Sequence, residues 1–249
     1  MSRFETALEI AREVSSFLRS PAGKGFSIEE KALNDYVTDS DRRAETMIRE
    51  RILKEFPDDE ILGEEYGVSG ASKRLWIIDP IDGTVNYMNH FPFYTVSIAY
   101  EENGETVFGI VSVPEQGEIF YAKKGEGAYL NSEKIAVSTL ESHKALAILV
   151  PPHRHHEELD GYLTSMRRLY EIYSDVRSIG SAALSLCYLA SGRVSCYYER
   201  LLHIYDVAAG LLIAKEAGAE IVLDCHDSFI DVIATSQGLL EKTRDAIDG

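Results

Sequence analysis

One short apolar run places strong limits on how this chain can fold, because it leads directly into two acidic side chains. Residues 75–86 read LWIIDPIDGTVN, so Asp79 and Asp82 lie at the end of a stretch suited to a buried strand. Pro80 cannot donate to a sheet ladder, and Gly83 lets a ligand approach the backbone closely. The pattern predicts a strand that ends near Asp79 and turns both carboxylates to one side. The alternative is a simple turn with two solvated acids.

Acids stand in comparable positions elsewhere in the chain. Thr84 is a good N-cap for a helix whose first N–H groups would face an anion beside the carboxylates. Glu64 follows the apolar run that ends at Gly63, and Asp206 lies at the start of an apolar helix. Asp206 can be a helix cap, a metal ligand or both, because one carboxylate oxygen can do each. The sequence therefore predicts a site that combines cation and anion binding.

Composition limits the class of protein. The 249 residues are 45% hydrophobic and 27% charged, enough for one large domain or two packed lobes. The net charge of −16 argues against a nucleic acid partner, and it would repel a phosphorylated substrate unless bound cations reverse the local field. No apolar stretch reaches the roughly 20 residues of a membrane span. Three cysteines without a C-x-x-C pair predict buried, reduced thiols in a cytoplasmic protein.

Hydrophobic periodicity divides the chain into two regions near residue 142. The elements predicted for the first region are a helix over 3–19, a helix from Thr38 to Pro57, a strand over 73–79, and an antiparallel meander over 94–137 with a hairpin at Asn103-Gly104. The elements predicted for the second are strands at 145–150, 193–198, 220–223 and 231–236, alternating with helices at 155–170, 181–192, 206–218 and the C-terminus. The expected domains are an N-terminal α+β lobe over 1–142 with an antiparallel sheet and a C-terminal α/β lobe over 143–249, forming one compact unit.

Six ordered segments carry a resemblance to a known family. They are V-T-x-x-D at 37–41, G-E-E at 63–65, W-I-I-D-P-I-D-G-T-x-N at 76–86, G-S-A-A at 180–183, Y-Y-E at 197–199 and Y-D-x-A-A-G at 205–210. Together they resemble the inositol monophosphatase family of Mg²⁺-dependent phosphatases, over about residues 30 to 220. The resemblance implies a layered αβαβα sandwich and a homodimer.

The resemblance also implies a set of metal ligands. Glu64, Asp79 and the backbone carbonyl of Ile81 would hold a first Mg²⁺ ion, and Asp79, Asp82 and Asp206 a second. A weaker third ion would lie near Glu64. Chemistry supports such a set, because oxygen-only ligands select hard cations and because several carboxylates in one cleft repel one another without them.

Further roles follow from the same resemblance. Gly83 and Thr84 would offer N–H groups to the phosphate, and Thr84 would share with Glu64 the task of orienting the attacking water. Asp41 would lie behind Thr84. On sequence alone, Asp41 can equally be the capping-box acid that pairs with Thr38.

Substrate contacts are expected on the second half of the chain. The resemblance places substrate hydroxyls near Ala182 and Glu199, and it implies hydrolysis of a small phosphorylated sugar or polyol by direct attack of water. Inositol-1-phosphate is the first choice of substrate. Fructose 1,6-bisphosphate is the alternative, and it needs a cation for its second phosphate, for which the candidates are Arg177, Arg193 and Arg200. Cleavage of 3′-phosphoadenosine 5′-phosphate or NADP ranks lower, and a non-catalytic metal-binding homologue is the alternative from another class.

The chain departs from the family pattern in its substrate-side segments. Tyr205 replaces the usual Trp, the segment 150–172 is short, and 224–230 lacks the usual Gly-rich turn. These departures leave substrate specificity open.

Several charged or metal-binding residue types near these segments have a plain interpretation. His153, His155 and His156 lie too close together, without nearby Cys, to predict a zinc site, so a solvated loop or helix start is expected. Lys31 is expected to be solvated, with a place on a loop that brings up a third metal as the alternative. Glu65 is expected on a charged surface.

Overall fold

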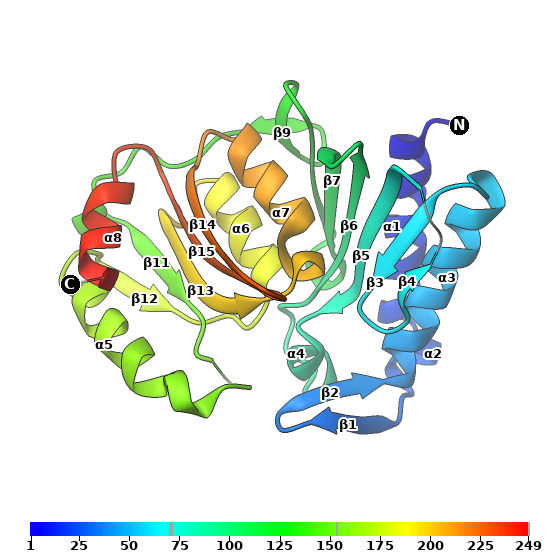
Figure 1. Cartoon of the computed structure of the whole chain (residues 1–249), viewed down its shortest axis with the longest axis horizontal. Helices are drawn as coiled ribbons and strands as arrows, with labels where there is room; N and C mark the ends of the chain where they lie inside the picture. The colour runs from blue at the N-terminus through cyan, green and yellow to red at the C-terminus, as the bar shows by residue number, and fades with distance from the viewer. Residues whose placement is uncertain (70–71, 153, 249) are drawn as a thin grey trace.

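The computed structural model describes residues 1–69, 72–152 and 154–248, and its elements stack in five layers (Figure 1). The first layer covers one face of a large sheet and contains α1 (Arg3–Arg19), the short α2 (Pro21–Lys24) and α3 (Asp39–Glu55). Helices α1 and α3 confirm the two helices predicted from the apolar stripes. Thr38 caps α3 through a capping box with Asp41.

The second layer is an eight-stranded sheet with strand order β10-β9-β8-β7-β6-β5-β3-β4. Its strands are β3 (Glu60–Gly63), β4 (Gly67–Ser69), β5 (Arg74–Asp82), β6 (Thr95–Glu102), β7 (Glu105–Val113), β8 (Glu118–Lys123), β9 (Gly127–Leu130) and β10 (Glu133–Ile135). Strands β6 and β7 form the hairpin predicted at Asn103-Gly104. The expected antiparallel sheet is only partly correct, because β3 and β5 pair in parallel. Strands β4 and β5 lie on opposite sides of β3. Strand β4 runs antiparallel to β3 as its hairpin partner, and β5 runs parallel to β3.

The third layer consists of α6 (Ala182–Ala190) and α7 (Ile204–Glu216), which lie between the two sheets (Figure 1). Both helices are apolar on most sides because sheets cover them from both directions. Gly109 on β7 lets α7 approach closely, since a Cβ there would lie 2.7 Å from the carbonyl oxygen of Ala209. Helix α7 also contacts β5, so this packing brings the start of α7 toward the end of the strand that carries Asp79.

The fourth layer is a five-stranded sheet, and the fifth is its outer helices. The strand order is β12-β11-β13-β15-β14, with β11 parallel to both neighbours and β15 antiparallel to β13 and β14. The elements are β11 (Leu146–Leu149), β12 (Asp175–Arg177), β13 (Cys196–Leu202), β14 (Glu220–His226), β15 (Phe229–Thr235), α5 (Leu159–Tyr170) and α8 (Leu240–Asp248). The predicted layered αβαβα sandwich is confirmed.

Two short elements border the site. The hairpin of β1 (Ile28–Ala32) and β2 (Asp35–Thr38) extends beyond the sheets, and α4 (Thr84–Met88) follows β5 directly (Figure 1). The sequence pattern gave no signal for this hairpin, whose first strand is exposed along its whole length. Cys187 and Cys196 are buried as expected, whereas Cys225 is exposed on β14. Among the described helices, none has the length and apolar character needed to cross a membrane.

Candidate active site

A cavity of about 610 Å³ opens where the end of β5 meets the starts of α6 and α7. Its acidic lining comes from elements that are far apart in sequence: Glu64, Asp79, Asp82, Glu199 and Asp206. The same cavity is lined by Ile81, by the turn at Gly83 and Thr84, and by Ala182. The structure thus brings the predicted ligands and substrate-side residues to one place, with Asp41 just behind them.

The end of β5 differs from the predicted simple stop. The strand continues through Pro80 to Asp82, and its register against β6 shifts between Asp79 and Asp82. This irregularity is a bulge that turns the backbone and re-aims the side chains. Asp79 and Asp82 are 1% and 7% exposed, so the alternative of two solvated acids is wrong. The N–H of Ile81 donates to Asp79 Oδ1 at 3.0 Å and fixes that carboxylate locally.

Asp82 is bound to the start of α6 across the interface between the two sheets. Its Oδ2 accepts hydrogen bonds from the hydroxyl of Ser181 at 2.5 Å and the N–H of Ala183 at 2.8 Å, and its Oδ1 accepts from the N–H of Ala182 at 3.2 Å. The hydroxyl of Thr95 adds a longer contact of 3.3 Å. Helix N–H groups and the macrodipole stabilise a negative charge at this position. Substrate hydroxyls were expected near Ala182, and the N–H of this residue is engaged by Asp82.

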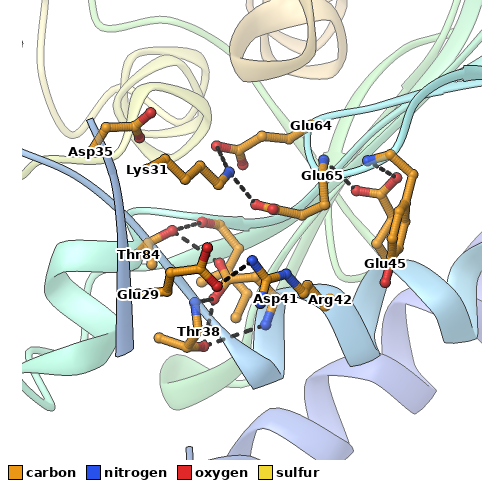
Figure 2. A network of polar contacts seen from close by, with 12 residues as sticks. Glu29, Lys31, Asp35, Thr38, Asp41, Arg42, Glu45, Glu64, Glu65 and Thr84 are labelled. Carbon is orange, nitrogen blue, oxygen red and sulfur yellow. Dashed lines mark hydrogen bonds and ion pairs between the residues drawn. The ribbon is translucent and has the colours of Figure 1, made fainter. Parts of the chain in front are cut away.

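Thr84, Asp41 and Thr38 form a chain of hydrogen bonds beneath the cavity (Figure 2). Thr84 Oγ1 lies 3.0 Å from Asp41 Oδ1 and 3.1 Å from the carbonyl oxygen of Ile81. The other oxygen of Asp41 accepts from the N–H of Thr38 at 2.8 Å. The two readings of Asp41 are thus compatible, since it closes the capping box of α3 and also holds the Thr84 hydroxyl.

Gly83 connects β5 to α4 in a conformation that requires glycine, and it is the N-cap of α4 in place of Thr84, which was the expected cap. Its φ is +96°, and a Cβ would lie 3.0 Å from the carbonyl oxygen of Gly180 and 3.1 Å from that of Phe93. The side-chain amide of Asn86 donates to the carbonyl oxygens of Phe93 and Ile179 at 2.6 and 2.7 Å. The turn that would hold the phosphate is therefore clamped against the segment that leads into α6.

The turn carrying Glu64 is held from below by a buried carboxylate that the sequence did not reveal. Glu45 on α3 accepts from the N–H of Glu65 at 2.7 Å and from the N–H of Tyr66 at 3.3 Å, and it pairs with Arg49 at 2.7 Å. Gly63 makes room for it, because a Cβ there would lie only 2.1 Å from Glu45 Oε1. Glu45 lies on the buried stripe of α3, and an acid at such a position is the available sequence signal.

Lys31 and its neighbours correct one expectation. Lys31 is exposed as a residue, as expected, but its ammonium also lies 2.7 Å from Glu65 and 3.7 Å from Glu64 (Figure 2). Glu65 was expected on the surface, yet its side chain is only 4% exposed. Lys31 enters from the β1–β2 hairpin, whose position no local pattern specified.

Asp206 lies in the first turn of α7. Its Oδ2 accepts from the N–H of His203 at 2.6 Å. The capping bond thus uses one carboxylate oxygen, as the sequence allowed. Tyr205 stacks on His203 with ring centroids 5.0 Å apart, and His203 packs on Phe229 at the same distance. Ring packing thus holds Tyr205 next to Asp206.

Electrostatics of the cavity favour added cations. Burial, and then the charges of Glu64, Asp82 and Asp206, raise the pKa of Asp79 well above its ordinary value. Burial also raises the pKa values of Glu64 and Asp206, with neighbouring carboxylates adding to the effect. These groups hold their protons more tightly because several negative charges share a poorly solvated space. Divalent cations would remove that repulsion.

The donor set fits a hard divalent ion by its chemistry. Glu64, Asp79, Asp82 and Asp206 offer carboxylate oxygens, and Ile81 offers a carbonyl oxygen, which are the ligands that Mg²⁺ prefers. Within residues 1–69, 72–152 and 154–248, no three His, Cys, Asp or Glu side chains converge on one point as a ready metal cage. Ion binding therefore requires the side chains to turn toward a common centre inside the cavity.

Glu199 lies on the wall opposite the end of β5. Tyr197 donates to its Oε2 at 2.7 Å, and burial raises the pKa of Glu199 to about 8. The bulge that follows Glu199 places Leu201 at a φ of +60°. This irregular end of β13 positions Glu199 and Arg200 in the lining of the cavity.

The predicted cations for a second phosphate are mostly elsewhere. Arg193 pairs with Glu118 and Arg177 with Asp175, and neither lines the cavity. Arg200 does line it, as does Arg154, which the sequence did not single out. The available sequence signal for this second cation was the arginine within residues 151–158, which read PPHRHHEE.

The histidines of that run have no metal-like arrangement among the described residues. His155 packs edge-on against Phe229, and His156 lies 3.0 Å from the side-chain amide of Asn34 at the start of a single helical turn. The expectation of a solvated helix start holds for exposed His156, whereas His155 is half-buried. His153 lies outside the described residues.

Comparison with known proteins places these features in context. The family model described as inositol monophosphatase family matches residues 2–246. A fructose-1,6-bisphosphatase/inositol-1-monophosphatase of Thermotoga maritima is 38% identical over 219 residues, covering 88% of this chain and 83% of the relative. Inositol monophosphatase 2 of Rattus norvegicus is 35% identical over 240 residues, covering 93% of this chain and 82% of the relative. Among solved structures, the extragenic suppressor protein suhB of Bartonella henselae superimposes with a TM-score of 0.92 at 31% identity, covering 98% of this chain and 97% of that one.

Proposed function

The chain belongs to the inositol monophosphatase family of phosphatases, and we propose that it is a Mg²⁺-dependent phosphomonoesterase that hydrolyses small sugar or polyol phosphates, inositol-1-phosphate among them. The observation that carries the proposal is the convergence of four acids from separate segments on one cavity, beside the turn at Gly83 and Thr84. The four acids are Glu64, Asp79, Asp82 and Asp206. Relatives named for inositol monophosphatase activity support the substrate class.

The metal ions would be held by these four carboxylates and by the carbonyl of Ile81. Two or three Mg²⁺ ions, when bound, would activate the attacking water and stabilise the leaving alkoxide. The cavity's own acids would otherwise repel a phosphate, so the same ions make anion binding possible. Soft-metal chemistry is disfavoured, because the donors at this position are oxygens.

The hydroxyl of Thr84 already donates a hydrogen bond within the protein. It points to Asp41 or to the carbonyl of Ile81, both about 3 Å away, so a lone pair of the hydroxyl oxygen is available to accept a hydrogen bond from the attacking water and orient it. Glu64 would orient the same water from the other side. The N–H groups of Gly83 and Thr84 would hold the phosphate, and Glu199 would bind substrate hydroxyls on the far wall.

A panel of phosphate esters tests the proposal. Inorganic phosphate release would be measured with inositol-1-phosphate, fructose 1,6-bisphosphate, 3′-phosphoadenosine 5′-phosphate and NADP, across a Mg²⁺ titration and with a chelator. We expect Mg²⁺-dependent release from the inositol or sugar esters and none with the chelator. Saturable Mg²⁺ binding without turnover of any ester would instead identify a non-catalytic homologue and contradict the proposal.

Fructose 1,6-bisphosphatase activity is the second candidate, and a specific observation favours it. The cavity lining includes Arg154 and Arg200, two cations that a substrate with a second phosphate would need. A relative carrying both activities in its name agrees with this candidate. We also propose that the protein is cytoplasmic and that it is a homodimer. Sedimentation of the purified protein would test the dimer.

A further inference from the structure

The two arginines in the cavity lining differ in how firmly they are held. Arg200 donates to Asp231 at 2.9 Å and to Glu158 at 2.6 Å, so both sides of its guanidinium are occupied. Arg154 makes an ion pair with Asp35, its Nη2 lying 2.8 Å from Asp35 Oδ1. Within the described part of the chain, that is the ion pair the structure gives Arg154. Arg154 is therefore the cation of this cavity that a ligand can recruit most easily.

The pair between Arg154 and Asp35 is suited to exchange. The two atoms are close, but they are not aligned as a hydrogen bond, since Asp35 Oδ1 has no hydrogen-bond partner among the described residues. The side chain of Arg154 is 37% exposed and that of Asp35 is 24% exposed, although Asp35 Oδ1 itself is buried, so the pair is held by charge without an aligned hydrogen bond. A phosphate oxyanion can instead take two parallel N–H groups from the guanidinium, which gives a stronger and better directed contact.

Arg154 also stands at the correct end of the cavity for a distal group. Burial lowers its pKa, but the charges of Asp35, Glu64 and Asp206 outweigh burial and raise the pKa overall, so the guanidinium in the cavity lining lies within the electrostatic influence of these carboxylates. The exposed fraction of the side chains falls from 37% at Arg154 to 10% at Glu64, and Asp79 is 1% exposed as a residue. The cleavage site thus lies deep, and Arg154 lies toward the mouth.

We propose that Arg154 binds the second phosphate of a sugar bisphosphate while the first phosphate is cleaved at the deep end of the cavity. Arg154 is then a specificity-determining residue that favours bisphosphates, and Asp35 is the carboxylate that the second phosphate displaces. A volume of about 610 Å³ lies within the range of small-molecule sites and accommodates such a ligand. This inference rests on the proposed phosphatase function, whose reacting end it leaves unchanged.

The test compares two substrates in matched variants. The kcat and KM values for fructose 1,6-bisphosphate and inositol-1-phosphate would be measured with saturating Mg²⁺ for wild type, Arg154→Gln and Arg177→Gln. Arg177 is the control because it pairs with Asp175 away from the cavity. Thermal unfolding would confirm that each variant is folded.

We expect Arg154→Gln to raise KM for the bisphosphate roughly 10- to 100-fold, the range for losing a charged hydrogen bond. KM for the monophosphate should change by no more than about twofold, as for a surface substitution. For Arg154→Lys, KM for the bisphosphate should lie between the values for wild type and Arg154→Gln, because lysine keeps the charge but lacks the paired N–H groups of the guanidinium. Asp35→Asn should lower KM for the bisphosphate by removing the competing carboxylate, and Arg177→Gln should alter neither substrate.

Two outcomes would overturn the inference. An equal loss for both substrates in Arg154→Gln would show that Arg154 acts on the cavity as a whole, and no loss for the bisphosphate would show that it binds nothing there. If wild type releases phosphate from neither ester, the proposed function fails separately. Equilibrium dialysis of fructose 1,6-bisphosphate then decides this inference: weaker binding to Arg154→Gln supports it, and equal or absent binding rejects it.

Discussion

The two sides of the cavity are built by different means. We call residues 79–84 together with Asp41 the carboxylate edge, and residues 150–152, 154–158 and 199–201 the outer wall. The carboxylate edge is fixed by short hydrogen bonds between backbone groups and acids, such as those from Ile81 to Asp79 and from Ala183 to Asp82. The outer wall is held by ion pairs between long, partly exposed side chains, such as Arg200 with Glu158.

This difference separates chemistry from selectivity. Buried, well-hydrogen-bonded groups keep a fixed geometry, which a reaction centre needs. Exposed ion pairs contribute little stability and rearrange easily, so they suit a surface that adapts to different substrates. Changes at the carboxylate edge should therefore affect every substrate, and changes in the outer wall should affect some substrates more than others.

The largest effect is expected at the centre of the carboxylate edge. Asp79→Asn should lower kcat by roughly 10³-fold or more on all substrates, because a ligand predicted to bridge two ions is lost. With a chelator present, the same variant should unfold at a higher temperature than wild type, because the raised pKa of Asp79 marks an ionised form that burial and like charges disfavour. Each kcal/mol of relieved repulsion would raise Tm by about 2–4 °C.

Scanning calorimetry with and without Mg²⁺ checks both parts of that expectation. Wild type should gain stability with Mg²⁺, by about 2.7 kcal/mol at 100 times its Kd, and Asp79→Asn should gain much less. Asp160→Asn is the control, since Asp160 is exposed on α5. A lower Tm for chelated Asp79→Asn than for chelated wild type would contradict the view that these acids repel one another.

The next effect concerns the turn that carries Glu64. Glu45→Gln removes the charge that pairs with Arg49 and weakens the acceptor for the N–H groups of Glu65 and Tyr66. The Mg²⁺ concentration for half-maximal activity should rise about 10- to 100-fold, as for other residues that orient ligands. The exposed Glu50→Gln on the same helix serves as control. An unchanged Mg²⁺ requirement in folded Glu45→Gln would show that the turn holds its shape without this acid.

The contrast between the carboxylate edge and the outer wall also explains which parts of the structure could be predicted from the sequence. Asp79, Asp82, Gly83 and Thr84 lie within six residues, so local rules for strands and turns predicted that they group together, although the bulge that carries the strand past Pro80 was not predicted. The αβαβα layering came from a resemblance over many ordered motifs, and the hairpin at Asn103-Gly104 from turn chemistry.

The remaining features depend on long-range packing. The parallel pairing of β3 with β5 depends on which side of β3 the chain crosses, which no local pattern records. Arg154 and Lys31 are flexible side chains on segments without periodicity, and only the tertiary structure directs them to Asp35 and Glu65. Sequence reasoning thus reached the carboxylate edge and, in the outer wall, Glu199 and Arg200, but it missed Arg154.

A smaller effect is expected where the carboxylate edge contacts the segment before α6. Gly83→Ala places a Cβ against the carbonyl oxygens of Gly180 and Phe93 and retains a left-handed φ. Gly104→Ala has a comparable φ of +80° with nothing within 4 Å, so it isolates the strain from the contact. Both variants should lose about 1–2 kcal/mol of stability from strain. Only Gly83→Ala should also lose activity, by about tenfold in kcat/KM. Equal kcat/KM values for Gly83→Ala and Gly104→Ala would show that this contact has no role in activity.

The smallest effect tests the outer wall through pH. The pKa of Glu199 is raised by burial to about 8 in the folded protein, so the folded state binds more protons than the unfolded state between about pH 4.5 and 8. Stability from this group is therefore present at low pH and is lost as pH rises toward 8. Glu199→Gln removes that dependence, so its unfolding free energy should match wild type near pH 4 and exceed it by at least about 1 kcal/mol at pH 9, since each unit of pKa shift corresponds to about 1.4 kcal/mol. Chemical denaturation of the chelated proteins at both pH values measures the difference. The metal-ligand carboxylates are the same in wild type and Glu199→Gln, so their titration cancels in the comparison. If the two unfolding free energies differ by the same amount at both pH values, Glu199 is already ionised at low pH, and the outer wall is as well solvated as the surface.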